Sequence, residues 1–324
     1  MRALITGGYG FVGKHLANHL VSCGDDVAVT YLPGVEVPQD RDSEEKGIRL
    51  PAVVQSFALD VAQKDAVEQL IALTKPDVVY HLAAISFVPQ GENDSSKIYQ
   101  ANLMGTVHCL DAIAKKSPST RFLLVSSAEV YGDPLGGSLP LNEQMPLRPI
   151  STYGVTKAAA ELAAYKAAIR EGVYTVRVRP FPHIGPGQSD SFAISSFAKQ
   201  VAEIALGKKE PKVLVGNLEV KRDYSDVSDI VRGYREAALN GKRGDVYNLC
   251  SGKSLTIGSM LQELIKISGK EIEVQPDPAR MRAIDIPDSY GSYDKAHKDF
   301  GWKPRIDLLG TMHSNLAYWV EMLS

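Results

Sequence analysis

The segment "LITGGYGFVGKHL", near the start of the 324-residue chain, constrains the fold more than any other. Its glycines are spaced three residues apart, between the apolar run at residues 2–6 and a stretch with helical periodicity. A strand that turns tightly through glycine into a helix leaves backbone N–H groups at the helix N-terminus free to bind an anion. This context predicts a turn that binds the pyrophosphate of a dinucleotide. The residues of the expected turn are Gly7, Gly10, Phe11, Val12 and Gly13.

Short apolar runs alternate with amphipathic segments through the first half of the chain. This alternation is typical of βαβ units and a parallel sheet. It predicts an α/β fold with a doubly wound parallel sheet of the Rossmann type. The expected strands are residues 2–6, 26–30, 53–59, 77–83, 121–127 and 174–180, and the expected helices are residues 11–23, 62–74, 94–116 and 152–170.

The pattern changes from Phe181 onward, where Pro and Gly become frequent and the alternation breaks up. We therefore expect a smaller α+β lobe in the C-terminal half that binds the substrate. Within it, "DVSDIVRGYREAALN" has the Asp and Ser residues of a helix start, and this helix could return to pack on the sheet. The expected division is 1–180 with 226–250 for the dinucleotide-binding domain, and 181–225 with 251–324 for the substrate-binding lobe.

Composition argues against several classes of protein. The 36 basic and 38 acidic residues give a formal charge of -2 without a basic stripe, so nucleic-acid binding is not expected. No apolar run reaches the roughly 18 residues that cross a bilayer, and the N-terminus resembles a strand rather than a signal peptide. The three cysteines lack metal-ligand spacing, so no metal is expected. The chain is expected to be cytoplasmic, without membrane contact.

The segment "STYGVTK" places Tyr153 four residues before Lys157. Residues four apart share one face of a helix, so both side chains can point into one cleft. Taken alone, this spacing is more typical of a solvated helical face. A phenol with an ordinary pKa near 10 is a poor acid or base at neutral pH unless a nearby ammonium group stabilises its phenolate. Lys157 would provide that charge and is expected to lower the pKa of Tyr153. The pair therefore needs further motifs before it indicates catalysis.

Three further motifs accompany the pair in order along roughly the first 190 residues. Together they resemble the extended short-chain dehydrogenase/reductase family. This resemblance implies that Tyr153 exchanges a proton with a substrate oxygen while hydride moves to or from a nicotinamide. It also implies that Lys157 holds the nicotinamide ribose and that Ser127 binds the same oxygen as Tyr153, with Ser126 as an alternative that faces the sheet. The motifs are the spaced glycines, "YHLAA" at 80–84 and "SSAEVYG" at 126–132.

The family resemblance also extends the set of cofactor contacts. Asp60 aligns with an aspartate that reads the adenine, or it caps the helix that follows. At the end of the second strand Thr30 and Tyr31 stand where NAD enzymes carry an acid. The missing acid favours NADP(H), and the missing neighbouring arginine leaves NAD(H) open. The other expected contacts are Val61, Leu82, Ala83, Ala84 and Asn102.

The substrate residues are implied by similar segments in family members that act on nucleotide sugars. Arg222 and Arg282 match arginines that bind the diphosphate, although two such arginines could equally form surface salt bridges. Ser86 is a further candidate. The segment "RPFPHIGPGQS" resembles that of the GDP-4-keto-6-deoxy-mannose reductases, with His183 in place. These enzymes usually have Asn where this chain has Pro182, so a side-chain amide contact must be lost or replaced.

The expected function is NAD(P)H-dependent reduction of the 4-keto group of a nucleotide-linked 6-deoxy sugar. The expected reaction converts GDP-4-keto-6-deoxy-D-mannose to GDP-D-rhamnose. Glu129 stands where 4,6-dehydratases carry an acid/base glutamate, so a dehydratase or a 4-epimerase is the alternative, and a non-catalytic dinucleotide sensor is a second. The family resemblance also implies a homodimer that pairs helices near 102–116 and 153–170.

Overall fold

A computed structural model describes residues 1–34, 46–86, 94–133, 139–281 and 286–324. Its main feature is a seven-stranded sheet in which every neighbouring pair of strands is parallel. The predicted doubly wound α/β fold is confirmed, and a seventh strand comes from the region expected to return to the sheet. In spatial order the strands are β11 (Val246–Leu249), β6 (Tyr174–Pro180), β5 (Arg121–Val125), β4 (Val78–His81), β1 (Arg2–Thr6), β2 (Asp26–Tyr31) and β3 (Gln55–Ala58).

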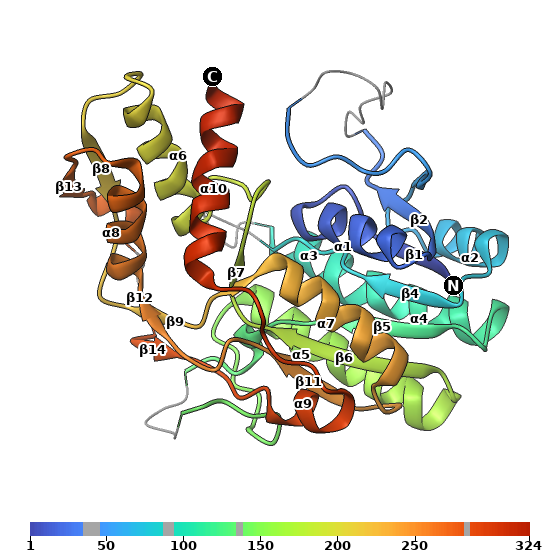
Figure 1. The fold of residues 1–324 in the computed structure, drawn as a ribbon. Helices are drawn as coiled ribbons and strands as arrows, with labels where there is room; N and C mark the ends of the chain where they lie inside the picture. Colours follow the sequence, from blue (N-terminus) through green and yellow to red (C-terminus); the bar gives the residue numbers. More distant parts are fainter. Residues whose placement is uncertain (35–45, 87–93, 134–138, 282–285) are drawn as a thin grey trace.

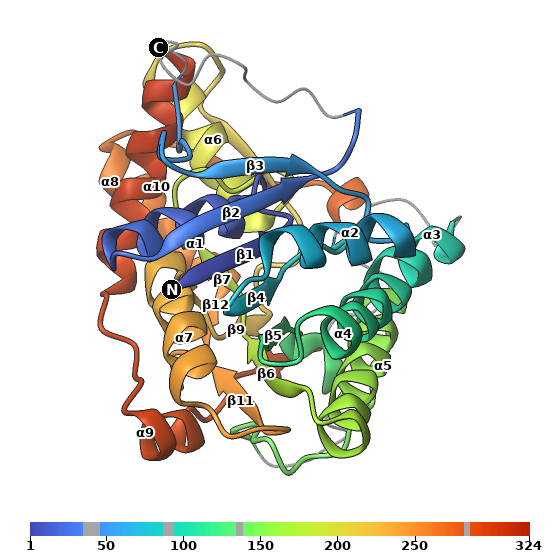
Figure 2. The same ribbon diagram turned by 90° about the vertical axis from the view of Figure 1, so that its right-hand side faces the viewer.

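Helices cover both faces of the sheet, as Figure 2 shows. Successive side chains of a strand point to opposite faces. Ile5 of β1 accordingly joins a buried cluster with α1 (Phe11–Ser22) and α7 (Val227–Asn240), while Leu4 joins another with the helices opposite. Those opposite helices are α2 (Lys64–Thr74), α4 (Gly105–Lys116) and α5 (Thr152–Lys166). Shorter helical segments are α3 (Ser95–Tyr99), the π-helical turns Gln100–Met104 and Ala167–Glu171, and α9 (Asp294–Phe300).

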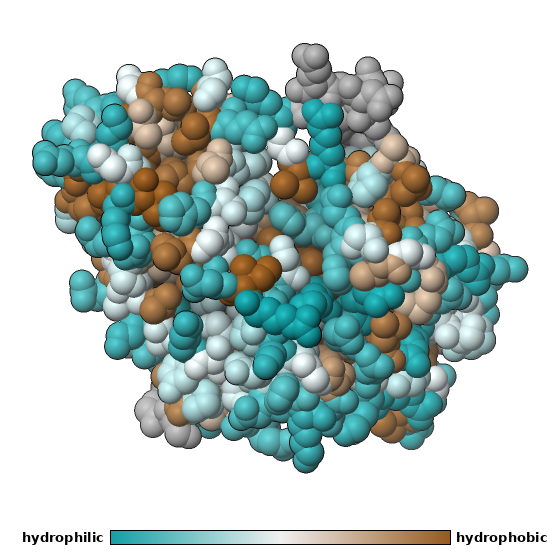
Figure 3. All heavy atoms as spheres, viewed as in Figure 1, coloured by the Kyte–Doolittle hydropathy of each residue, from teal (hydrophilic) through white to brown (hydrophobic). Residues whose placement is uncertain are grey.

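The remaining elements form a second, smaller group with its own apolar cluster. It lies to the left of the seven-stranded sheet in Figure 1, and apolar side chains also reach the surface over it in Figure 3. Its short strands pair in three small sheets. The helices are α6 (Ala193–Ala205), α8 (Ile257–Ser268) and α10 (Leu308–Leu323). The strands are β7 (His183–Ile184) with β10 (Ser225–Asp226), β8 (Lys212–Val215) with β13 (Glu273–Pro276), and β9 (Lys221–Arg222) with β12 (Leu255–Thr256) and β14 (Asp288–Ser289).

One buried carboxylate joins the segments that run between the two groups of elements. Asp223, which follows β9, accepts hydrogen bonds from the backbone N–H and hydroxyl of Ser251 at 2.7 and 2.6 Å. It also accepts from the backbone N–H groups of Gly252 and Gly291 at 3.0 and 3.2 Å. Burial raises the pKa of Asp223, and these hydrogen bonds oppose the shift. The sequence alone did not single out this residue.

None of the helices in the described ranges combines the length and hydropathy that a bilayer crossing requires. The cytoplasmic location stays a prediction. Among the described residues, no three His, Cys, Asp or Glu side chains gather in a way that could hold a metal ion.

Candidate active site

The glycine turn has the geometry that its sequence predicts. Gly7 has a φ of +73°, which side chains other than glycine rarely adopt, and its carbonyl accepts from the N–H of Gly10 at 3.1 Å. A Cβ on Gly13 would lie 2.6 Å from the Gly7 carbonyl oxygen, so only glycine lets α1 approach the turn this closely. The helix begins after Gly10, which has no side chain to cap it. The first N–H groups of α1 are therefore available to an anion.

Thr30, at the end of β2, holds the glycine turn in place by accepting two of its backbone hydrogen bonds. Its side chain is buried, its hydroxyl accepts from the N–H of Gly7 at 3.2 Å, and its carbonyl accepts from the N–H of Gly8 at 2.9 Å. The Thr30 hydroxyl therefore supports the turn through this hydrogen bond. Tyr31, the next residue, packs edge-on against Tyr9 of the turn with ring centroids 5.4 Å apart.

The segment after β4 lies directly beside the glycine turn. Leu82 and Ala83 donate their N–H groups to the carbonyl and hydroxyl of Thr6, each at 3.2 Å. A Cβ on Gly7 would lie 3.0 Å from Ala83 Cα. The structure thus brings Leu82, Ala83 and Ala84 to the same edge of the sheet as the turn, where α/β folds bind their ligands.

Asn102 holds this segment against the helix that carries Tyr153. Its side chain is buried, accepts from the N–H of Ile85 at 2.8 Å and donates to the Ile85 carbonyl at 3.1 Å. The same amide donates to the Thr156 hydroxyl at 3.0 Å. Its polar groups are thus engaged within the protein, and Asn102 positions the cofactor segment relative to α5.

Asp60 and Val61 have mainly local roles in this structure. The Asp60 carboxylate accepts from the N–H of Ala62 at 2.9 Å and closes a turn. Helix α2 is preceded by Gln63, so Asp60 is not its N-cap residue, which corrects that alternative. Val61 is buried and packs on α4, where a Cβ on Gly105 would lie 2.6 Å from its Cγ2.

Ser127, Tyr153 and Lys157 come together at the carboxyl end of β5. Ser127 precedes the 3-10 turn Ala128–Val130, and Tyr153 and Lys157 lie on α5. Ser127 hydrogen-bonds Tyr153, and Lys157 Nζ lies 5.7 Å from the Tyr153 ring centroid. Helix α5 approaches closely because Gly154 lacks a Cβ, which would lie 2.8 Å from the Glu129 carbonyl oxygen.

The electrostatics differ from the expectation that Lys157 lowers the pKa of Tyr153. Burial raises the pKa of Tyr153, the hydrogen bond with Ser127 opposes this, and the Glu129 carboxylate adds to it. The Lys157 ammonium donates instead to the Val125 carbonyl at 2.8 Å, and burial lowers the pKa of Lys157 to about 8. Tyr153 is therefore held as a neutral phenol, the form that can donate a proton.

Glu129 has an exposed side chain next to Ser127, and its N–H donates to the Ser127 hydroxyl at 3.1 Å. Its charge acts on Tyr153, so it lies near the reacting groups. Ser126 faces away from them and donates to Glu161, as expected for the residue that faces the sheet.

The segment "FPHIGPGQ" packs against the start of α1. His183 stacks on Phe11 with ring centroids 6.2 Å apart and an interplanar angle of 14°. Its Nδ1 lies 2.9 Å from the Phe181 carbonyl oxygen, and burial lowers the pKa of His183. The Pro182 carbonyl accepts from the N–H of Ser225 at 3.0 Å. This segment therefore connects the glycine turn with the smaller group of elements.

The structure describes Arg222 and Ser86, but not Arg282, of the remaining predicted substrate residues. Arg222 lies on β9 and donates to the carbonyls of Lys221 and Ile286 at 2.8 and 2.6 Å, which fixes one side of its guanidinium. Ser86 is exposed at the end of a described range. Arg282 lies outside the described residues. The structure therefore does not test the expected diphosphate clamp.

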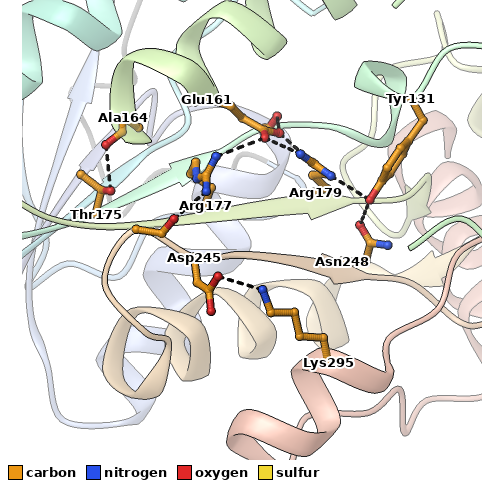
Figure 4. A network of polar contacts seen from close by, with 11 residues as sticks. Tyr131, Glu161, Ala164, Thr175, Arg177, Arg179, Asp245, Asn248 and Lys295 are labelled. Atoms are coloured by element: carbon orange, nitrogen blue, oxygen red, sulfur yellow. Dashed lines mark hydrogen bonds and ion pairs between the residues drawn. The ribbon is translucent and has the colours of Figure 1, made fainter. Parts of the chain in front are cut away.

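Sequence reasoning missed a buried ion pair behind the site. The Arg179 guanidinium donates to Glu161 at 2.9 and 2.7 Å (Figure 4), and both side chains are buried. Buried charges are almost always paired. The signal was present in "TVRVRP", where Arg177 and Arg179 interrupt a strand expected to be apolar on both faces.

A Rossmann sheet with this glycine turn and a Ser–Tyr–Lys set at its carboxyl edge defines the extended short-chain dehydrogenase/reductase class. The model of the family described as GDP-mannose 4,6 dehydratase matches residues 4–313, and the chain belongs to that family.

Known proteins are similar to this chain over nearly its whole length. The chain is 34% identical to the GDP-6-deoxy-D-mannose reductase of Pseudomonas aeruginosa, over 98% of this chain and 97% of that protein. The structure of RMD from Pseudomonas aeruginosa complexed with NADPH has a TM-score of 0.84 and 32% identity, covering 99% of each chain. The UDP-glucose 4-epimerase of Thermotoga maritima, solved with UDP-glucose, has a TM-score of 0.85 and 26% identity over all of both chains.

Proposed function

We propose that this protein reduces the 4-keto group of a nucleotide-linked 6-deoxy sugar with NAD(P)H. The proposed reaction converts GDP-4-keto-6-deoxy-D-mannose to GDP-D-rhamnose. The proposal is carried by the Ser127, Tyr153 and Lys157 set beside the glycine turn, in a chain 34% identical to a GDP-6-deoxy-D-mannose reductase along almost its full length. The substrate would lie between the sheet's carboxyl edge and the smaller group of elements, which we propose is the substrate-binding lobe.

The side chains of this site suit the proton half of such a reduction. Ser127 would orient the C4 carbonyl oxygen by a hydrogen bond, and Tyr153, held as a neutral phenol, would donate the proton that this oxygen gains. The bound nicotinamide supplies the hydride that C4 gains. Lys157 would hold the ribose, and its positive charge would stabilise the phenolate that Tyr153 becomes after it donates its proton.

We propose NADP(H) as the preferred cofactor, with NAD(H) as the alternative. At the carboxyl end of β2, residues 30–34 are Thr, Tyr, Leu, Pro and Gly. No acid is therefore available in this stretch to bind the 2′-hydroxyl of NAD or to repel a 2′-phosphate. Binding isotherms for NADPH and NADH, followed by quenching of tryptophan fluorescence, would compare the two. Tighter binding of NADH would contradict the preference.

One assay tests the proposed function. Purified protein is mixed with GDP-4-keto-6-deoxy-D-mannose and NADPH or NADH, and the absorbance of the reduced cofactor is followed. Stoichiometric oxidation and formation of GDP-rhamnose are expected. Conversion of GDP-mannose to its 4-keto-6-deoxy derivative without added reductant would instead identify a dehydratase, the alternative that Glu129 favours. Epimerisation of a nucleotide sugar, or cofactor binding with no turnover of any of these substrates, would likewise reject the reductase.

The pH dependence should reflect the lowered pKa of Lys157. Because burial lowers this pKa from 10.5 to about 8, the reductase should lose kcat/KM as the pH rises through about 8, when the ammonium loses its proton. Tyr153 stays neutral over this range because its pKa is raised. Initial rates between about pH 6 and 10 would show the loss, and Lys157→Arg, which keeps its charge, should lack it. A flat profile up to about pH 9.5 would contradict the assignment.

We also propose that the protein forms a homodimer through α5. Four large apolar side chains of α5 and the turn after it are exposed at helical spacing, an unusual surface for a monomer. Their exposed fractions are 37% for Val155, 62% for Leu162, 48% for Tyr165 and 59% for Ile169.

Leu162→Glu is expected to shift the protein from dimer to monomer, because it buries a charge in the proposed interface. Light scattering coupled to size-exclusion chromatography would measure the mass. Leu73→Glu is the matched control, because Leu73 on α2 is 71% exposed and lies outside the proposed interface. A Leu162→Glu variant that keeps the same mass as the parent protein would reject this interface.

A further inference from the structure

Two contacts tie the catalytic helix α5 to the end of strand β5. Lys157 Nζ donates to the Val125 carbonyl at 2.8 Å, and the Ser126 hydroxyl donates to Glu161 Oε1 at 2.5 Å. Ser127, the hydrogen-bond partner of Tyr153, follows directly in the chain. These two contacts therefore set where Ser127 lies relative to Tyr153.

The carboxylate of Glu161 is itself fixed by charge. Arg179 donates from Nε to Oε1 at 2.9 Å and from Nη2 to Oε2 at 2.7 Å, and Arg177 Nη1 lies 3.8 Å from Oε2. The side chain of Glu161 is fully buried. A bidentate arginine fork fixes the plane of a carboxylate. The Oε1 oxygen of Glu161, which accepts from Ser126, therefore has one defined position.

The same ion pair also reaches the chain on the other side of Ser127. Arg179 Nη1 donates to the Tyr131 hydroxyl at 3.0 Å, and this hydroxyl donates to Asn248 Oδ1 at 2.6 Å (Figure 4). Tyr131 comes directly after the 3-10 turn that Ser127 precedes. Ser126 and Tyr131 are therefore both anchored to the Glu161–Arg179 pair, and the short segment between them contains Ser127.

Glu161 also acts on the charge of Lys157. Burial lowers the pKa of Lys157, and the Glu161 carboxylate one helical turn further along raises it in part. The other titratable groups that face Lys157 are Tyr153 on the same helix and His81 on β4. Burial and the Lys157 charge lower the pKa of His81 to about 3, so His81 is neutral and adds no charge. The Glu129 carboxylate acts on Tyr153.

We propose that Glu161 is a positioning residue for the reduction, which it serves by fixing Ser127 against Tyr153. Its carboxylate also favours the charged form of Lys157. This role rests on the proposed function of the site. Glu161 is fully buried behind the site, and it acts through Ser126, Arg179 and Lys157.

The first test compares two buried hydroxyl groups that tie α5 to a strand. Ser126→Ala removes the tie beside the site and leaves the Glu161–Arg179 pair in place. Thr175→Val removes a similar tie, from Thr175 on β6 to the Ala164 carbonyl at 3.0 Å, further along the helix. A similar small fall in melting temperature is expected for both. Only Ser126→Ala should lower kcat, by about tenfold, with the NADPH dissociation constant changed by less than about twofold.

The second test measures the charge effect directly. In Glu161→Gln, the titration of the Lys157 ammonium followed by 15N NMR should move to lower pH, because the carboxylate that raises this pKa is gone. The fall of kcat/KM at high pH should move with it. Equal kcat in Ser126→Ala and Thr175→Val, or an unmoved Lys157 titration, would overturn the positioning role. A parent protein without reductase turnover would overturn the proposed function instead, and the NMR titration would still test Glu161.

Discussion

Replacing Tyr153 by phenylalanine is expected to lower kcat by about 10³- to 10⁴-fold, because it removes the proton donor and keeps the ring. The hydroxyl is the group that Ser127 hydrogen-bonds, and burial holds it protonated. NADPH affinity should change little, since the glycine turn and Lys157 remain. Single-turnover rates with GDP-4-keto-6-deoxy-D-mannose, together with a fluorescence titration of NADPH, would separate the two effects.

Tyr165→Phe is the matched control for this prediction. Tyr165 lies on the same helix, its side chain is 48% exposed, and its ring packs under the Arg177 guanidinium at 5.3 Å. Phenylalanine keeps that ring, so this variant should retain nearly the parent kcat. A Tyr153→Phe enzyme that kept more than about a tenth of the parent rate would show that another group donates the proton.

Replacing Gly13 by alanine should weaken NADPH binding by about 10- to 100-fold. The added Cβ would lie 2.6 Å from both the Gly7 carbonyl oxygen and Gly8 Cα, so the backbone of the turn must shift. A shifted turn loses hydrogen bonds from its N–H groups to the pyrophosphate, and each such bond to a charged group contributes about 1.5–3 kcal/mol. Isothermal titration with NADPH would measure the loss.

Gly310→Ala provides the control, because Gly310 also lies in a helix and a Cβ there would have no neighbour within 4 Å. It should bind NADPH like the parent and be slightly more stable, since alanine favours a helix by up to about 1 kcal/mol over glycine. If Gly13→Ala bound NADPH as tightly as Gly310→Ala, the pyrophosphate would not lie at this turn.

The positions of the first six strands along the chain and the glycine turn could be predicted from the sequence because their signals are local. An apolar run, a tight turn and an amphipathic helix each depend on residues that are close in sequence. The segment "LITGGYGFVGKHL" therefore predicts its strand, turn and helix without information from the rest of the chain. The same holds for Tyr153 and Lys157, whose four-residue spacing fixes their common face once the helix forms.

Local signals did not predict what surrounds these groups. The expectation that Lys157 would lower the pKa of Tyr153 followed from charge alone, and it was wrong for this structure because burial has the larger effect on both residues. Burial depends on which helices cover the site. Thr30 likewise stood at the predicted strand end, but only the packing of the turn shows that its hydroxyl is committed to Gly7.

The sequence by itself therefore determined the parallel α/β sheet, the glycine turn and the presence of a Ser–Tyr–Lys set. Only the tertiary structure decided how these groups are charged and supported. Asp223 joins Ser251 and Gly291, and Glu161 joins Ser126 and Arg179. These partners are between 18 and 68 residues apart in the chain, and no periodicity or motif reports such a pairing. A buried charge needs partners that are close in space, and these can be far apart in the sequence. Its role is therefore known only once the packing of the strands and helices is known.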